Sequence, residues 1–469
     1  MSSRLPLLGV LRLGRPSDIW FKPALSVVAA VAPPNLTLLA LGRLDLAMYT
    51  MAGSLCALYA HNRPYATRAR VLAWVVLGML AGLGAALVAA SLTRDAVVLV
   101  TVGAVLAAVQ KVLCDATRIG PPGNVVLTFI SSAALFAPQS LGQIPGHLAL
   151  AAAAGAWAWL VGMAPGLLRP HGPERRATAA ALDAAAAHAE TADRDAAQAH
   201  TAVRAARQAL RSAGSPSEAR RALERLVVQA EVALAAPADA DPALLRAWAR
   251  QVRGNRPVPD VDDLPGIDTE RTAHPESWRH RLRPLAPLAV RTALGCALAG
   301  YASLALGVGR PYWALVTAAS LYQANLTLTW GRGVQRVVGN LLGVLLFAAL
   351  VPLAHTGAAA LVLCCLALSF GAEALIGRNY WLGSVCVTPM ALLITEFAGF
   401  QEPGLLITER VVDTLVGALV GLVAAVAVPH RSRVARGGRT GPRTLAATGR
   451  SREPHPDQRT GTTTEGVRP

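Results

Sequence analysis

Long apolar runs constrain the fold of this chain more than any other feature. Runs of roughly 20 residues with very few charges recur along it, and a helix needs about that length to cross the hydrocarbon core of a bilayer. Six candidates lie at 22–42, 44–60, 71–92, 96–113, 121–141 and 146–168. Six more lie at 285–308, 311–329, 333–353, 357–376, 380–397 and 404–428. The sequence therefore predicts an all-α integral membrane protein with two six-helix transmembrane halves.

The positive charge of the chain lies in its tails and short loops. A formal net charge of +16 would by itself suggest nucleic-acid binding. However, residues 430–469 hold nine Arg against three acids, whereas residues 169–283 are nearly balanced, with 18 Arg against 16 acids. Cytoplasmic loops of membrane proteins are enriched in Lys and Arg, because positive segments cross the bilayer poorly. We therefore expect a lipid bilayer and no nucleic acid as partner.

The loop charges also predict an orientation. With both termini in the cytoplasm, the inner connections hold Arg63, Arg68, Arg70, Lys111, Arg118, Arg332, Arg336 and Arg378. The outer connections hold only Arg43, Arg94 and Arg310, as the enrichment of cytoplasmic loops requires. Only two of the 44 basic residues are Lys, which is typical of a GC-rich bacterial genome. The expected location is a bacterial cytoplasmic membrane, which the chain crosses many times.

Five regions follow from these patterns. We expect a cytosolic N-terminal segment (1–21), a first transmembrane half (22–168), a cytosolic helical domain with its linker (169–283), a second transmembrane half (284–429) and a disordered basic tail (430–469). The middle region is rich in helix-forming residues, and the tail lacks the apolar residues that a core requires. The sequence from Gly42 resembles that from Gly309, so the two halves are expected to be repeats of one orientation.

The stretch "RPYWALVTAASLYQANLTLTWGRGVQRVVGNLLG" holds most of the candidate site residues. Thr317 and Ser320 share one helix face, which also includes Ala324 and Thr327, and Arg332 and Arg336 are expected at the inner mouth. The arginines either attract an anion or only anchor the helix to lipid phosphates. GxxxG spacings, which let helices approach closely, occur at Gly339/Gly343, Gly78/Gly82 and Gly417/Gly421. Packing is the more common role of such glycines, and the hydroxyls could equally bond to a neighbouring helix.

Further ionisable and aromatic residues lie within or at the ends of the apolar runs. Arg410 and Asp413 are three residues apart and are expected to pair, as a structural pair or as part of a pathway. Arg291, Glu373 and Glu396 are additional candidates, and a carboxylate such as Glu396 would suit proton coupling. Tyr312-Trp313 and Tyr380-Trp381 are expected in the interfacial aromatic belt, with stacking on an aromatic substrate as the alternative.

Several motifs resemble the FUSC family, named for fusaric acid resistance, which includes the aromatic acid exporters. They are "LAVRTALGCALAG", "RPYWALVTAASLY", "GRGVQRVVGNLLG" and "ERVVDTLVGALVGLVAA", and the likeness spans residues 285–430, with a weaker one over 20–170. The resemblance implies export of hydrophobic or aromatic carboxylic acids. It also implies roles for Tyr312, Trp313, Arg336, Gly339, Gly343, Arg410, Asp413 and Gly417.

The expected function is therefore a transporter that exports small organic anions and is coupled to the proton gradient. The alternative is a passive anion channel, or a membrane scaffold that uses its cytosolic domain for docking. No Walker, HExxH or GxSxG motif occurs, so we expect no enzyme activity, no cofactor and no metal site. Protons and a small organic anion are the expected partners, and the glycine-lined contacts would suit a homodimer.

Overall fold

The structure is a computed structural model, and it describes residues 8–14, 20–191, 196–213, 217–254, 257–259, 282–323 and 326–427. Every regular element in these ranges is a helix, which confirms the predicted all-α class. Most of the linker that precedes residue 282, and the whole tail from 430 onward, lie outside the described residues.

The apolar runs form helices on both sides of the middle region. Before it lie α1 (Phe21–Ala40), α2 (Ala47–Ser54), α3 (Tyr65–Leu92), α4 (Ala96–Thr117), α5 (Val125–Leu135), α6 (Ile144–Met163) and the short α7 (Pro165–Leu168). After it lie α12 (Ala286–Ala305), α13 (Tyr312–Leu321), α14 (Leu326–Ala354), α15 (Ala358–Ile376), α16 (Tyr380–Thr395) and α17 (Pro403–Ala427). We call these two sets the first and second series.

Three of the twelve expected spans are too short to cross a bilayer. Nine helical segments in the described ranges are long and apolar enough, whereas Leu44–Leu58, Val125–Leu135 and Tyr312–Leu321 are shorter apolar helices. At a rise of about 1.5 Å per residue, the ten residues of α13 span only about 15 Å. The prediction of a single helix over 311–329 was wrong, because α13 ends at Leu321 and Tyr322 adopts an extended conformation.

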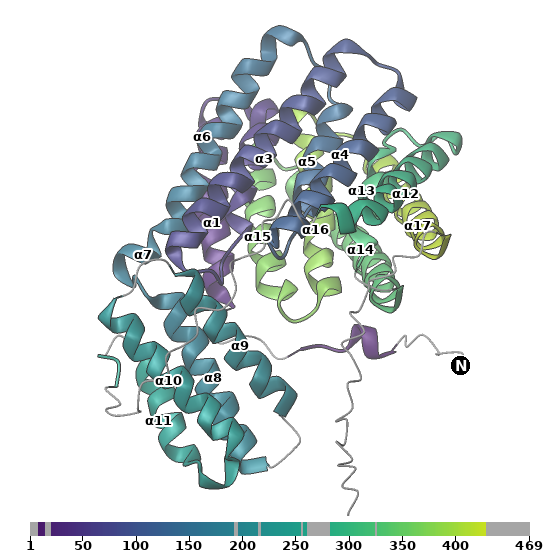
Figure 1. Ribbon diagram of the computed structural model, residues 1–469. Helices are drawn as coiled ribbons and strands as arrows, with labels where there is room; N and C mark the ends of the chain where they lie inside the picture. Colours follow the sequence, from purple (N-terminus) through teal and green to yellow (C-terminus); the bar gives the residue numbers. More distant parts are fainter. Residues whose placement is uncertain are drawn as a thin grey trace, which may run out of the picture. The chain divides into compact units, whose positions relative to one another are not determined.

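Helices of the two series pack against each other as well as among themselves (Figure 1). α1 packs on α15, α4 packs on α12, and α5 packs on α13. Within the second series, α14 packs on α16 and α17, and α13 packs on α17. The largest hydrophobic cluster accordingly includes residues of both series, such as Val31, Leu83, Phe347 and Leu393. The two series therefore share one hydrophobic core.

The middle region forms a group of helices with its own hydrophobic core (Figure 1). These are α8 (Gly172–Thr191), α9 (Ala196–Ser212), α10 (Glu218–Ala235) and α11 (Pro242–Arg253). Leu182, Leu223 and Leu226 are fully buried in this core. The hydroxyl of Ser217 accepts a hydrogen bond from the Arg220 amide, so the expected cap of α10 is present.

Candidate functional site

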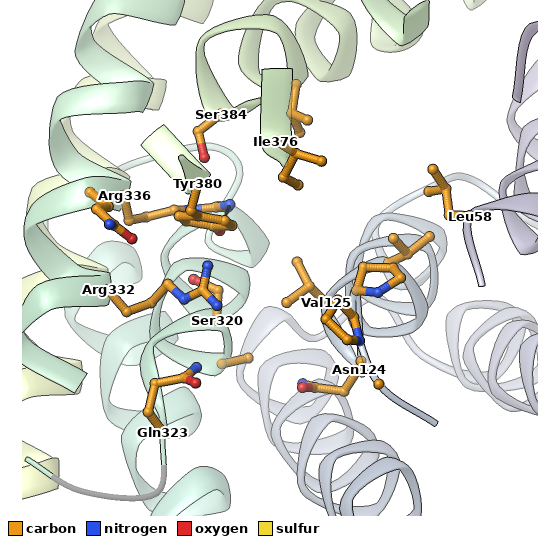
Figure 2. Close-up of a pocket in the computed structure, with 18 of the residues that line it drawn as sticks. Leu58, Asn124, Val125, Ser320, Gln323, Arg332, Arg336, Ile376, Tyr380 and Ser384 are labelled. Carbon is orange, nitrogen blue, oxygen red and sulfur yellow. Dashed lines mark hydrogen bonds between the residues drawn. The ribbon is translucent and has the colours of Figure 1, made fainter. Parts of the chain in front are cut away.

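A cavity of about 1080 Å³ lies where several apolar helices begin or end. From the first series, its walls include α1, the 3-10 turn Leu55–Leu58, the end of α4 and the start of α5. The second series contributes the end of α13, the start of α14, the end of α15 and the start of α16. Figure 2 shows Arg332, Arg336 and Tyr380 on one side of this space, with Leu58, Asn124 and Val125 on the other.

Each of the three short apolar helices has one end at this cavity. Leu58 lies just beyond α2, Asn124 precedes α5, and Gln323 follows α13, and all three residues line the cavity. Irregular backbone at membrane depth is tolerated where it is buried in protein or lines a cavity. In addition, α2 and α13 are each the second apolar helix of their series. Interrupted helices at corresponding positions of two halves are a typical feature of substrate sites in transporters.

Two arginines on α14 line the cavity, and neither has an acidic partner among the described residues. Arg332 and Arg336 lie one helical turn apart, and both lie inside α14. The sequence had instead predicted that Arg332 lies in a loop before this helix. The Arg332 guanidinium lies 3.9 Å from the centre of the Tyr380 ring, and Arg336 Nη1 donates a 3.0 Å hydrogen bond to the Tyr380 hydroxyl. Arg336 is 4% exposed, and its Nε has no hydrogen-bond partner in the described ranges. Two cations that no described carboxylate neutralises form a natural site for an anion.

Polar side chains continue along α14 beyond Arg336. Asn340 Oδ1 accepts a 2.6 Å hydrogen bond from Thr388, and its Nδ2 donates a 2.9 Å bond to the Thr414 hydroxyl. The hydroxyl of Thr414 in turn donates to the carbonyl oxygen of Arg410. A buried polar network therefore joins α14 to α16 and α17 and leads from the cavity wall toward Arg410.

Arg410 and Asp413 do not pair with each other, so the expectation of an ion pair was wrong. The Arg410 guanidinium stacks on the Trp313 ring at 4.1 Å, and its Nε and Nη1 have no hydrogen-bond partner in the described ranges. Asp413 Oδ1 instead accepts a 2.5 Å hydrogen bond from the hydroxyl of Ser303 on α12. Spacing along α17 places both residues near one face, but neighbouring helices supply the contacts that each side chain makes.

Tyr312 and Trp313 are buried within the protein and do not lie in an interfacial belt. They are 5% and 1% exposed, respectively. Trp313 stacks on Phe129 of α5, with ring centroids 5.5 Å apart, and Tyr312 packs against Phe136. These contacts join α13 to the first series. Tyr380, expected in the belt as well, instead lines the cavity.

The other α12 and α13 candidates lie at or behind the cavity wall. Arg291 Nη2 donates a 3.3 Å hydrogen bond to the Gln323 carbonyl, and its guanidinium lies over the Tyr322 ring. Ser320 lines the cavity, whereas Thr317 packs toward Gly417 on α17. Arg291 therefore supports the extended segment after α13.

Glu396 does not line the cavity. Its carboxylate oxygens lie 3.1 and 3.2 Å from Nε2 of His355.

Two ion pairs were not predicted from the sequence. They are the Arg310–Glu409 pair and, at the cavity, the Lys111–Asp115 pair. The spacing of Lys111 and Asp115, four residues apart on α4, is a signal that could have found the second pair.

Five of the six motif glycines lie at close contacts. A Cβ added at Gly339 or Gly343 would lie within 2.6 Å of α16 atoms, and one at Gly417 would lie 2.4 Å from the Ala314 carbonyl oxygen. Gly421 also faces α13, and Gly82 faces the Gln110 side chain. A Cβ at Gly78 would meet nothing within 4 Å, so the structure does not place this glycine at a helix contact.

Part of the second series is similar to a known protein family. Residues 296–424 match the family described as fusaric acid resistance protein-like. This family segment runs from α12 to α17 and includes Arg336, Arg410 and Asp413, which confirms the resemblance predicted there. The match does not include residues 20–170.

One curated relative is also similar. It is an uncharacterized membrane protein of Bacillus subtilis (strain 168), YvaC, which is 33% identical over 131 residues. The alignment covers 28% of this chain and 21% of the relative, so the chain spans about a fifth of the relative's length. No solved structure matches the chain.

Proposed function

We propose that this protein is a transporter that exports small organic anions, most of all aromatic or hydrophobic carboxylic acids, from the bacterial cytoplasm. The observation that carries the proposal is the cavity with Arg332 and Arg336 on its wall and no acid paired with either in the described ranges. The match of residues 296–424 to fusaric acid resistance-like proteins supports it independently.

The chemistry of the cavity suits a carboxylate attached to an apolar body. A guanidinium binds a carboxylate through two parallel hydrogen bonds, and neither Arg332 nor Arg336 makes such a pair with a carboxylate in the described ranges. Apolar residues, among them Leu55, Leu58, Ile376, Val387 and Met390, line other parts of the wall. Ligand sites typically combine an apolar lining with a few polar groups that fix orientation.

The expected topology supports export as the proposed direction of transport. The cavity lies at the ends of α4, α13 and α15 and at the starts of α14 and α16. These ends carry Lys111, Arg118, Arg332 and Arg336, and the positive-inside rule assigns such ends to the cytoplasm. An anion would thus enter from the cytoplasm, and we propose that the proton gradient drives its exit.

Flux through reconstituted protein tests the proposal. Proteoliposomes that contain the full chain and labelled benzoate should lose the label faster than protein-free liposomes. An imposed proton gradient should accelerate this loss, and a protonophore should remove the acceleration. A flux that ignores the proton gradient at a clamped membrane potential would indicate a passive channel. The absence of any protein-dependent flux would contradict transport and leave the scaffold alternative.

A further inference from the structure

Glu373 brings to the same cavity a carboxyl group that no described residue pairs with. It lies on α15, on the face that also presents Ser369, Ala372 and Ile376 to the cavity. The side chain is half-buried, and its carboxylate makes no hydrogen bond or ion pair with any described residue. The other cavity acid, Asp115, differs because Lys111 Nζ lies 3.0 Å from its carboxylate.

The helices packed against α15 do not supply a partner for Glu373 either. These helices are α16, α1 and α14. Their ionisable groups are Lys22 on α1, Arg332 and Arg336 on α14, and Tyr380 and Cys386 on α16. None of these groups forms an ion pair or a hydrogen bond with the Glu373 carboxylate. The cavity lining therefore includes three arginines, Arg118, Arg332 and Arg336, and Glu373 forms no ion pair with any of them.

Separate charges of opposite sign in one cavity favour a solute that carries both signs. A charge in a partly enclosed site is stabilised by an opposite charge on its ligand. The arginines therefore favour a negative group on the solute, and Glu373 favours a positive one. A solute with only a carboxylate would satisfy Arg332 and Arg336 and would be repelled by Glu373.

We propose that the solute carries a cationic group, such as a protonated amine, in addition to its carboxylate. The carboxylate binds Arg332 and Arg336, and Glu373 accepts a hydrogen bond from the cationic group. This inference rests on the proposed function, because it assigns a narrower class of substrate to the same cavity.

Two aromatic acids of equal size test the inference. In 4-(aminomethyl)benzoate a methylene ammonium group stands where 4-ethylbenzoate has an ethyl group, so the probes differ mainly in the positive charge. Binding of each to the purified full chain is measured by calorimetry, and transport is measured in proteoliposomes. The wild-type protein should prefer the ammonium probe. Glu373→Gln should weaken binding of that probe by about tenfold or more and leave 4-ethylbenzoate unchanged or bound more tightly.

Glu402→Gln is the matched control, because Glu402 is an exposed acid that does not line the cavity. It should alter binding of neither probe. The inference is overturned if Glu373→Gln affects binding of both probes equally, or if the wild-type protein does not prefer the ammonium probe. The equal effect would instead indicate that Glu373 carries a proton. A preference in binding without any flux would contradict the proposed function while supporting this assignment.

Discussion

Replacing Gly417 with alanine should destabilise the protein by about 3 kcal/mol, near the upper end of the cost of overpacking a well-packed interior. The new Cβ would lie 2.4 Å from the Ala314 carbonyl oxygen and 2.8 Å from Thr317 Cβ. Because the first of these atoms belongs to the backbone, a side-chain rotation cannot relieve the contact, and α13 and α17 must separate. Thermal or denaturant unfolding in detergent micelles measures the change.

Gly78→Ala provides the matched control. Gly78 lies on the exposed face of α3, and a Cβ there would meet nothing within 4 Å. Alanine at a mid-helix position is favoured over glycine by about 0.5–1 kcal/mol, so this variant should be slightly more stable than the wild type. Equal destabilisation by both substitutions would contradict the close packing of α13 on α17.

Arg336→Gln should raise the KM for export of an aromatic carboxylate by about 10-fold to 100-fold, because a hydrogen bond to a charged group contributes about 1.5–3 kcal/mol. Glutamine retains a polar side chain but removes the positive charge and the paired donors that fit a carboxylate. Arg332→Gln should act in the same direction. Initial rates of flux in proteoliposomes, at matched amounts of folded protein, provide the measurement.

An arginine away from the cavity distinguishes local binding from the overall charge. Arg43 is exposed and pairs with Asp45 at 3.1 Å, so Arg43→Gln should leave the KM unchanged. If Arg336→Gln retained wild-type flux, the arginines of α14 would only anchor the helix, as one interpretation of the sequence holds.

The sequence predicted the helices well where hydrophobicity alone decides the structure. All twelve apolar runs contain helices, and the bounds of α15, α16 and α17 lie within two residues of those expected. The prediction for the run 311–329 failed because α13 ends at Leu321, and the polar residue Gln323, two residues later, lines the cavity. Hydropathy averages over such a position, whereas the structure depends on the cavity that the residue faces.

The candidate site was predictable in composition and less so in geometry. Residues three or four positions apart on a helix share a face. The cavity is accordingly lined by Arg332 and Arg336 on α14, and by Ser320 on α13. Contacts between distant segments, such as Arg410 on Trp313 and Asp413 with Ser303, follow from how α12, α13 and α17 pack. Spacing along one helix carries no information about those partners, so the Arg410–Asp413 pair was predicted and does not form.

The most direct test of the account is a crystal structure of the protein with 4-iodobenzoate, in which the anomalous signal of iodine locates the ligand. We expect the iodine in the cavity between the two series, with the carboxylate against Arg332 and Arg336, and no such peak in the Arg332→Gln, Arg336→Gln double variant. An iodine peak only at the lipid-facing surface, or one that persists unchanged in the double variant, would contradict an anion site at these arginines.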